Sequence, residues 1–111
     1  MSLNARQKGA RFERQVAEYL RHKGFEARRG QQFSGSPDSP DVVSNFPLHI
    51  EAKAVEKLNL DKAFEQAVSE CGDRPPCVIH KKNRKEILIT LRLDDFIPFT
   101  RRADQDSLTM R

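Results

Sequence analysis

The repeat length of the hydrophobic pattern changes along this chain, and that change limits the folds open to it. Apolar residues recur every three or four positions over residues 5–20 and again over residues 60–68, which is typical of amphipathic helices. Residues 48–53 alternate apolar and polar side chains, and apolar runs at residues 77–80 and 87–93 indicate further strands. Because a helix then joins two groups of strands in a short chain, the pattern predicts an α/β sandwich around a mixed central sheet.

Capping residues mark where the two helices begin and end. Asn4 and Gln7 have the spacing of a capping box, so the first helix is expected to start at residue 5, and Gly24 ends it. Asn59 can cap the second helix, and Gly72 closes it.

The remaining segments read as loops, short strands and a tail. Residues 30–40 are dense in Gly, Ser and Pro and are predicted to form a loop, and residues 45–47 a turn between two strands. Residues 93–97 are expected to form one helical turn. The pattern has no periodicity after Pro98, so we expect a domain at residues 1–97 and a frayed tail at residues 98–111.

The composition indicates a small domain with a thin core. The chain has 111 residues, of which 37% are hydrophobic and 32% charged, which is enough for one domain with one core. A thin core favours a homodimer in which a second subunit shares the burial. Lys and Arg outnumber Asp and Glu by 20 to 16 and gather in clusters, a distribution that suits nucleic acid as a partner.

Two cysteines do not make a disulfide framework, and their spacing is not that of a zinc site. No apolar run approaches the ~20 residues needed to span a membrane, and no signal peptide is recognisable. The sequence therefore favours an intracellular protein.

Two carboxylates are predicted to meet on one face of the sheet. Strand alternation points Glu51 and Lys53 to the same side. If residues 45–47 form a three-residue loop, Asp41 lies opposite Glu51 on the neighbouring strand. Two such charges about 5 Å apart repel by roughly 3 kcal/mol, more than the ~0.2–1 kcal/mol of a favourable cross-strand pair. A divalent cation such as Mg²⁺ or Mn²⁺ would remove the conflict.

Other interpretations of these residues remain open at this point. Glu51 and Lys53 could be a surface pair on a solvated strand. Glu13, at the edge of the buried stripe of the first helix, could pair with a nearby Arg, or it could reach toward the metal. His49 shares the face of Glu51, where a structural role is favoured over contact with the site.

The motifs resemble those of a known nuclease superfamily. Pro40-Asp41 followed by Glu51-Ala52-Lys53 is similar to the PD-(D/E)xK pattern. The start Lys8-Gly9-Ala10-x-x-Glu13 resembles small phage-type and archaeal Holliday-junction resolvase-like endonucleases. The resemblance covers residues 5–97 and implies a single-domain, restriction-endonuclease-like α/β/α core with a central mixed sheet.

The resemblance also implies an activity and a set of roles. It implies a Mg²⁺-dependent DNA endonuclease, with Mn²⁺ able to substitute, that leaves a 5′-phosphate and a 3′-hydroxyl. Asp41 and Glu51 resemble the metal ligands, with the Ala52 carbonyl and Glu13 as further ones. Lys53 resembles the catalytic lysine, and Gln66 stands where relatives carry a polar helper, although it could equally be a plain surface residue.

The expected partner is branched or structured DNA, bound by a homodimer acting in recombination or repair in a bacterial or phage-infected cell. The residues predicted to contact DNA are basic or polar and lie near the catalytic loop or in basic turns: Lys8, Arg11, Arg28, Arg29, Gln31, Gln32, Ser36, Lys57, Lys81, Lys82, Arg84 and Lys85. Two rival functions are a non-catalytic DNA-binding module on the same fold and a site-specific restriction-type endonuclease.

Overall fold

The computed structural model describes residues 4–30 and 41–109, with side chains as far as Arg101. Three helices and five strands follow one another in these described parts of the chain. Their order is α1 (Ala5–His22), β1 (Ala27–Arg29), β2 (Val42–Ser44), β3 (His49–Lys53), α2 (Leu60–Glu70), β4 (Pro76–His80), β5 (Leu88–Leu91) and α3 (Leu93–Thr109).

The five strands form one mixed sheet in the order β1-β2-β3-β4-β5. Three of the four pairings are antiparallel, and β3 pairs with β4 in parallel. A parallel pair needs a long crossover, and α2 provides it between these two central strands. The predicted mixed sheet is confirmed.

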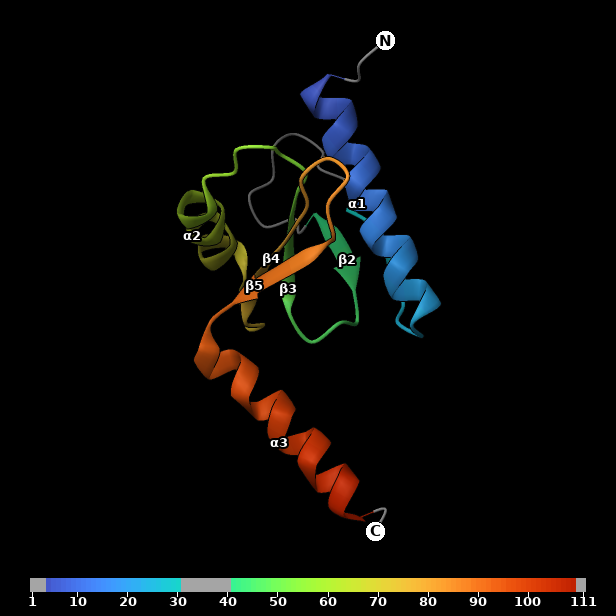
Figure 1. Cartoon of the computed structure of the whole chain (residues 1–111), viewed down its shortest axis with the longest axis vertical. Helices are drawn as coiled ribbons and strands as arrows, with labels where there is room; N and C mark the ends of the chain where they lie inside the picture. The colour runs from blue at the N-terminus through green and yellow to red at the C-terminus, as the bar shows by residue number, and fades with distance from the viewer. Residues whose placement is uncertain (1–3, 31–40, 110–111) are drawn as a thin grey trace.

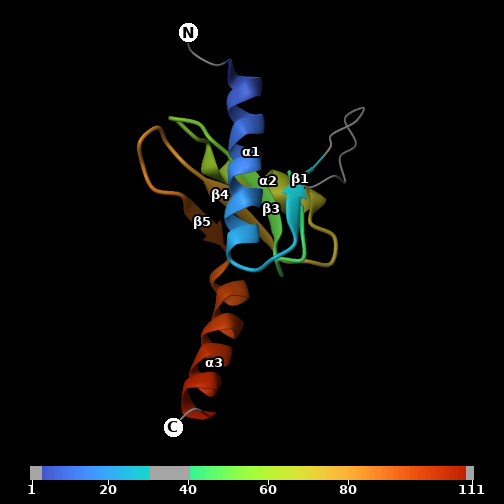
Figure 2. The same ribbon diagram turned by 90° about the vertical axis from the view of Figure 1, so that its right-hand side faces the viewer.

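Two helices cover opposite faces of the sheet (Figures 1 and 2). Phe12, Val16 and Leu20 of α1 pack in one cluster with Ile50 and other apolar residues of the strands. Ala63 and Ala67 of α2 pack on Val78 on the other face. The predicted α/β/α sandwich is therefore present, and β3, between the two layers, is covered on both sides.

The predicted helix caps are also present. The Asn4 side chain accepts the Gln7 backbone N–H at 2.9 Å, and the Gln7 side chain accepts the Asn4 N–H in return. The Asn59 side chain accepts the Lys62 N–H at 3.1 Å at the start of α2. Val68, assigned to the inner stripe of α2, is 38% exposed instead, so the buried face of this helix is narrower than its sequence suggested.

The C-terminal segment differs from the prediction. In place of one helical turn and a frayed tail, α3 runs from Leu93 to Thr109 through Pro98 and extends away from the sheet (Figure 1). Proline removes one backbone donor and bends a helix but does not always end it, and Asp94 and Asp95 favour the helix start through the helix dipole. The domain boundary at residue 97 stays a prediction. None of the helices in the described residues is long and apolar enough to cross a membrane.

Candidate active site

The hairpin of β2 and β3 has the register that brings the two predicted carboxylates together. Val42 lies opposite Ile50, so one step outward Asp41 lies opposite Glu51, as the three-residue loop predicted. Asp41 is buried, and its Oδ2 accepts the backbone N–H of Ala52 at 2.9 Å. This bond fixes the Asp41 carboxylate against the backbone of β3.

Glu51 is a fully buried carboxylate in the middle of the site. Its Oε1 lies 3.9 Å from Lys53 Nζ and its Oε2 lies 3.9 Å from His49 Nε2. Neither oxygen has a hydrogen-bond partner among the described residues. Burial first, and the Asp41 carboxylate second, raise the pKa of Glu51 to about 9, and Lys53 only partly opposes this.

Such an orphaned carboxylate is costly, because a buried polar group without a partner loses its hydration with no compensation. A divalent cation beside Glu51 and Asp41 would supply that compensation, and oxygen donors of this kind suit a hard cation. The residues present therefore fit a metal site. The interpretation of Glu51 and Lys53 as a solvated surface pair is wrong, since Glu51 is 0% exposed.

Glu13 reaches this region from α1. Its Oε2 accepts from Arg29 Nε of β1 at 2.8 Å. Burial raises the pKa of Glu13 against the effect of Arg29, and the charges of Asp41 and Lys53 also act on it. Glu13 thus pairs with an Arg, as one of the two alternatives had it, and the charges of Asp41 and Lys53 act on it, while its contact with a metal stays a prediction.

Gln66, His49 and Glu70 lie on the α2 side of the site, and of these the sequence analysis did not single out Glu70. Gln66 is exposed, and its Nε2 lies 3.5 Å from Glu70 Oε1. One ligand atom from each of His49, Glu51 and Glu70 lies within 4.8 Å of the others. Strand alternation already placed His49 on this face. For Glu70, the only sequence feature that could have indicated a place in the site was its position one helical turn after Gln66.

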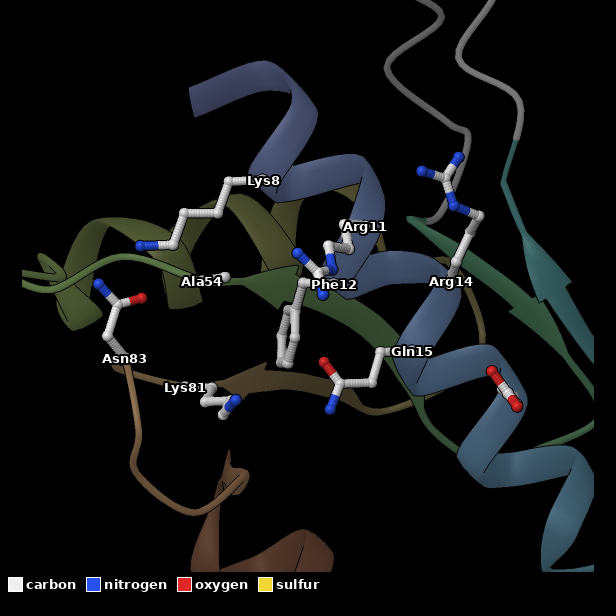
Figure 3. A pocket seen from close by; sticks show the side chains of 9 residues that line it. Lys8, Arg11, Phe12, Arg14, Gln15, Ala54, Lys81 and Asn83 are labelled. Carbon is white, nitrogen blue, oxygen red and sulfur yellow. The ribbon is translucent and has the colours of Figure 1, made fainter. Parts of the chain in front are cut away.

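A groove with a largely basic lining runs along α1 (Figure 3). It has a volume of about 820 Å³ and runs between one face of α1 and the loop after β4. Ala54, next to Lys53, forms part of its wall, and the Lys81 N–H donates to the Lys53 carbonyl at 3.0 Å. The groove therefore begins at the C-terminal end of β3, directly after Lys53. Its polar and basic lining comprises Lys8, Arg11, Arg14, Gln15, Glu18, Lys81 and Asn83.

The predicted DNA-contacting residues divide into three groups. Lys8, Arg11 and Lys81 line this groove. Arg29 is engaged by Glu13, and the remaining described ones are exposed outside the groove lining: Arg28, Lys57, Lys82, Arg84 and Lys85. Gln31, Gln32 and Ser36 lie outside the described residues. Arg14, Gln15 and Asn83 line the groove but were not predicted, since only the fold brings the loop after β4 to α1.

Comparison with known proteins gives one family match and one similar solved structure. Residues 4–107 match the family described as "Phage putative PDDEXK endonuclease". Among solved structures, the chain is similar to Hjc of Archaeoglobus fulgidus, a Holliday junction resolvase from an archaeal hyperthermophile. That similarity has a TM-score of 0.57 and 30% sequence identity, and it covers 73% of each chain. No curated protein matches the sequence.

Proposed function

The chain belongs to the phage PD-(D/E)xK endonuclease family, and from this premise we propose that it hydrolyses DNA phosphodiester bonds with Mg²⁺ as cofactor and Mn²⁺ as a substitute. The observation that carries the proposal is the buried Glu51 carboxylate, which lacks a hydrogen-bond partner among the described residues and lies opposite Asp41. Asp41, Glu51 and the Ala52 carbonyl would hold the metal, with Glu13 as an outer ligand. A metal bound there supplies positive charge at the phosphate and lowers the pKa of water.

The other side chains of the site have roles in this proposal that follow from their positions. Lys53, at the partly exposed end of β3, would orient the attacking water and balance the charge that develops on the phosphate. Arg29 holds Glu13 in place through the contact at 2.8 Å. The groove residues Lys8, Arg11 and Lys81 would hold the DNA backbone next to Lys53, since phosphate contacts position a duplex without reading its sequence.

The substrate and assembly form the finer part of the proposal. The similar archaeal protein is a Holliday junction resolvase, which supports branched DNA as the substrate and a role in recombination or repair. The family description supports a phage-infected bacterial cell as the place where the protein acts. A homodimer would suit a branched substrate with two strands to cut. Exposed apolar residues on β5 and at the start of α3 support that assembly.

A cleavage assay on matched substrates tests the function. Purified protein is incubated with a four-way junction, a nicked duplex and a linear duplex, with Mg²⁺ or with EDTA, alongside Lys53→Ala. We expect metal-dependent cutting of the junction by wild type and its loss in Lys53→Ala. Failure of wild type to cut any substrate would overturn the proposal. Salt-dependent DNA binding without cleavage would indicate a non-catalytic DNA-binding module instead. Cleavage of the linear duplex at one fixed sequence would indicate a restriction-type enzyme.

A further inference from the structure

The two oxygens of the Glu51 carboxylate lie near different side chains. Oε1 lies 3.9 Å from Lys53 Nζ, and Oε2 lies 3.9 Å from His49 Nε2. A carboxylate placed in this way can bridge two positions with one oxygen each. The catalytic metal proposed above would use the side of Asp41 and Lys53. The other oxygen is left facing a separate set of side chains.

That set has the composition of a metal site. His49 is only 7% exposed, and its Nε2 has no hydrogen-bond partner among the described residues, as holds for both Glu51 oxygens. Glu70, at the end of α2, completes a group whose three donor atoms lie within 4.8 Å of one another. His49, Glu51 and Glu70 thus bring one imidazole nitrogen and two carboxyl groups together, a donor set that a divalent cation would satisfy.

We propose that His49, Glu51 and Glu70 form a second divalent-metal site, distinct from the catalytic one and selective for a transition-metal ion over Mg²⁺. Imidazole nitrogen suits Zn²⁺, Cu²⁺, Fe²⁺ and Ni²⁺, whereas Mg²⁺ is suited to oxygen donors. The inference goes beyond the proposed function, because it concerns the opposite side of Glu51.

The surroundings provide access and support for this site. A cavity of about 520 Å³ reaches His49 and Glu70 from the end of the sheet opposite the basic groove, so an ion can enter without passing the catalytic carboxylates. Gln66 Nε2 lies 3.5 Å from Glu70 Oε1 and can orient that ligand from outside, a positioning role typical of the groups behind metal ligands. Arg74 also lines the cavity, but its Nη1 is engaged by the Ser44 and Phe46 carbonyls at 2.6 and 3.2 Å.

Mn²⁺ is a suitable probe, because its electron spin reports directly on a nitrogen ligand. In wild type we expect about two bound Mn²⁺ per chain and, in pulsed electron paramagnetic resonance, a coupling to ¹⁴N from an imidazole. His49→Gln and Glu70→Gln should each weaken one of the two binding events by about tenfold or more, and His49→Gln should abolish the ¹⁴N coupling. Glu65→Gln, an exposed carboxylate on the same helix, should keep both ions.

The same measurement separates this inference from the proposed nuclease. Asp41→Asn should lose the other ion and keep the ¹⁴N coupling. If wild type shows the coupling but cuts no DNA, the second site stands and the nuclease proposal fails. Absence of ¹⁴N coupling in Mn²⁺-loaded wild type overturns the second site, regardless of how the variants bind Mn²⁺. This measurement uses wild type alone, so it does not depend on whether His49→Gln folds.

Discussion

Glu51 makes the metal-free protein pH-sensitive. Its pKa is about 9 in the fold and about 4.5 in the unfolded chain. Between these values the folded protein keeps a proton that the unfolded chain releases, so stability falls as pH rises. The part of the stability that rests on neutral Glu51 is complete below about pH 4.5 and is lost as pH approaches 9.

Glu51→Gln should therefore stabilise the metal-free protein. An amide carries no charge to bury and can donate to Asp41, so we expect the free energy of unfolding to rise by about 1–3 kcal/mol near pH 8. The gain should shrink toward pH 5, because Glu51 of the unfolded chain releases less of its proton as the pH approaches 4.5. Urea melts in EDTA across this range measure it, with the exposed Glu65→Gln as control. A Glu51→Gln protein no more stable than wild type near pH 8 would contradict the electrostatic conflict described for this site.

Lys53 is predicted to act on the reaction and not on metal binding. Lys53→Met keeps the aliphatic stem and removes the charge, so we expect cleavage to fall by about 10²–10³-fold. The affinity for Mn²⁺ should change by no more than about threefold, because the ammonium is not a ligand. Single-turnover cleavage and metal titration separate the two effects, and the exposed Lys62→Met serves as the matched control. Equal losses of metal binding and cleavage would argue against this division.

Residue positions in the site were predictable where local geometry sets them. Strand alternation and the loop count placed Asp41 opposite Glu51, because a hairpin register depends only on the residues between the strands. Glu70 was not predictable in this way. Its place beside Glu51 depends on how α2 packs across β3 and β4, and a single sequence contains no direct signal for that packing.

At the level of elements, α1 has two faces with different tasks. Phe12, Val16 and Leu20 bury one face against the sheet, while Lys8 and Arg11 project from another into the groove (Figure 3). The helical repeat predicted the buried face. The helical repeat did not predict the groove on the other side. Its wall includes Lys81 and Asn83 from the loop after β4, which lies next to α1 only once the sheet has formed.

The groove face of α1 should determine DNA affinity. We expect Lys8→Ala with Arg11→Ala to weaken DNA binding and to reduce the slope of log affinity against log salt by about 0.9 for each phosphate that is no longer neutralised. Arg6→Ala, on the same helix but outside the groove lining, should leave the slope unchanged. Fluorescence anisotropy over a series of salt concentrations measures both. A slope that falls equally for Arg6→Ala would place the DNA elsewhere on the surface.

At the scale of the whole molecule, the order of helices and strands follows the changes in the hydrophobic repeat along the chain. The helix–strand–helix–strand order and the mixed sheet were predictable because each element has its own period, and short connections restrict the arrangements. The length of α3 was missed. The residues of α3 after Pro98 show no helical repeat of apolar side chains that would predict a helix. Pro98 also suggested that the helix ends where it in fact continues. Phe99 of α3 packs against the core, while the exposed apolar residues at the start of this helix are expected to contact a second copy of the chain.

The last prediction concerns those contacts. β5 lies at the edge of the sheet and exposes Leu88, while Leu93 at the start of α3 is 71% exposed. Ile89, Phe96 and Ile97 are also exposed. A stable dimer buries about 800 Å² per partner, so these residues of β5 and α3 would have to be covered together. This is the surface that a second copy of the chain is expected to cover.

Sedimentation velocity tests this assignment. Wild type should sediment as a dimer, and Leu88→Lys with Leu93→Lys should shift it to monomer without a loss of helix or strand signal. Both positions are exposed in a single chain, so the fold itself does not need them. Val68→Lys, an exposed apolar position on α2 away from this surface, should remain dimeric. If the double variant stays dimeric, the subunits meet elsewhere. If wild type is monomeric at micromolar concentration, the assembly proposed for cutting branched DNA has to form on the DNA itself.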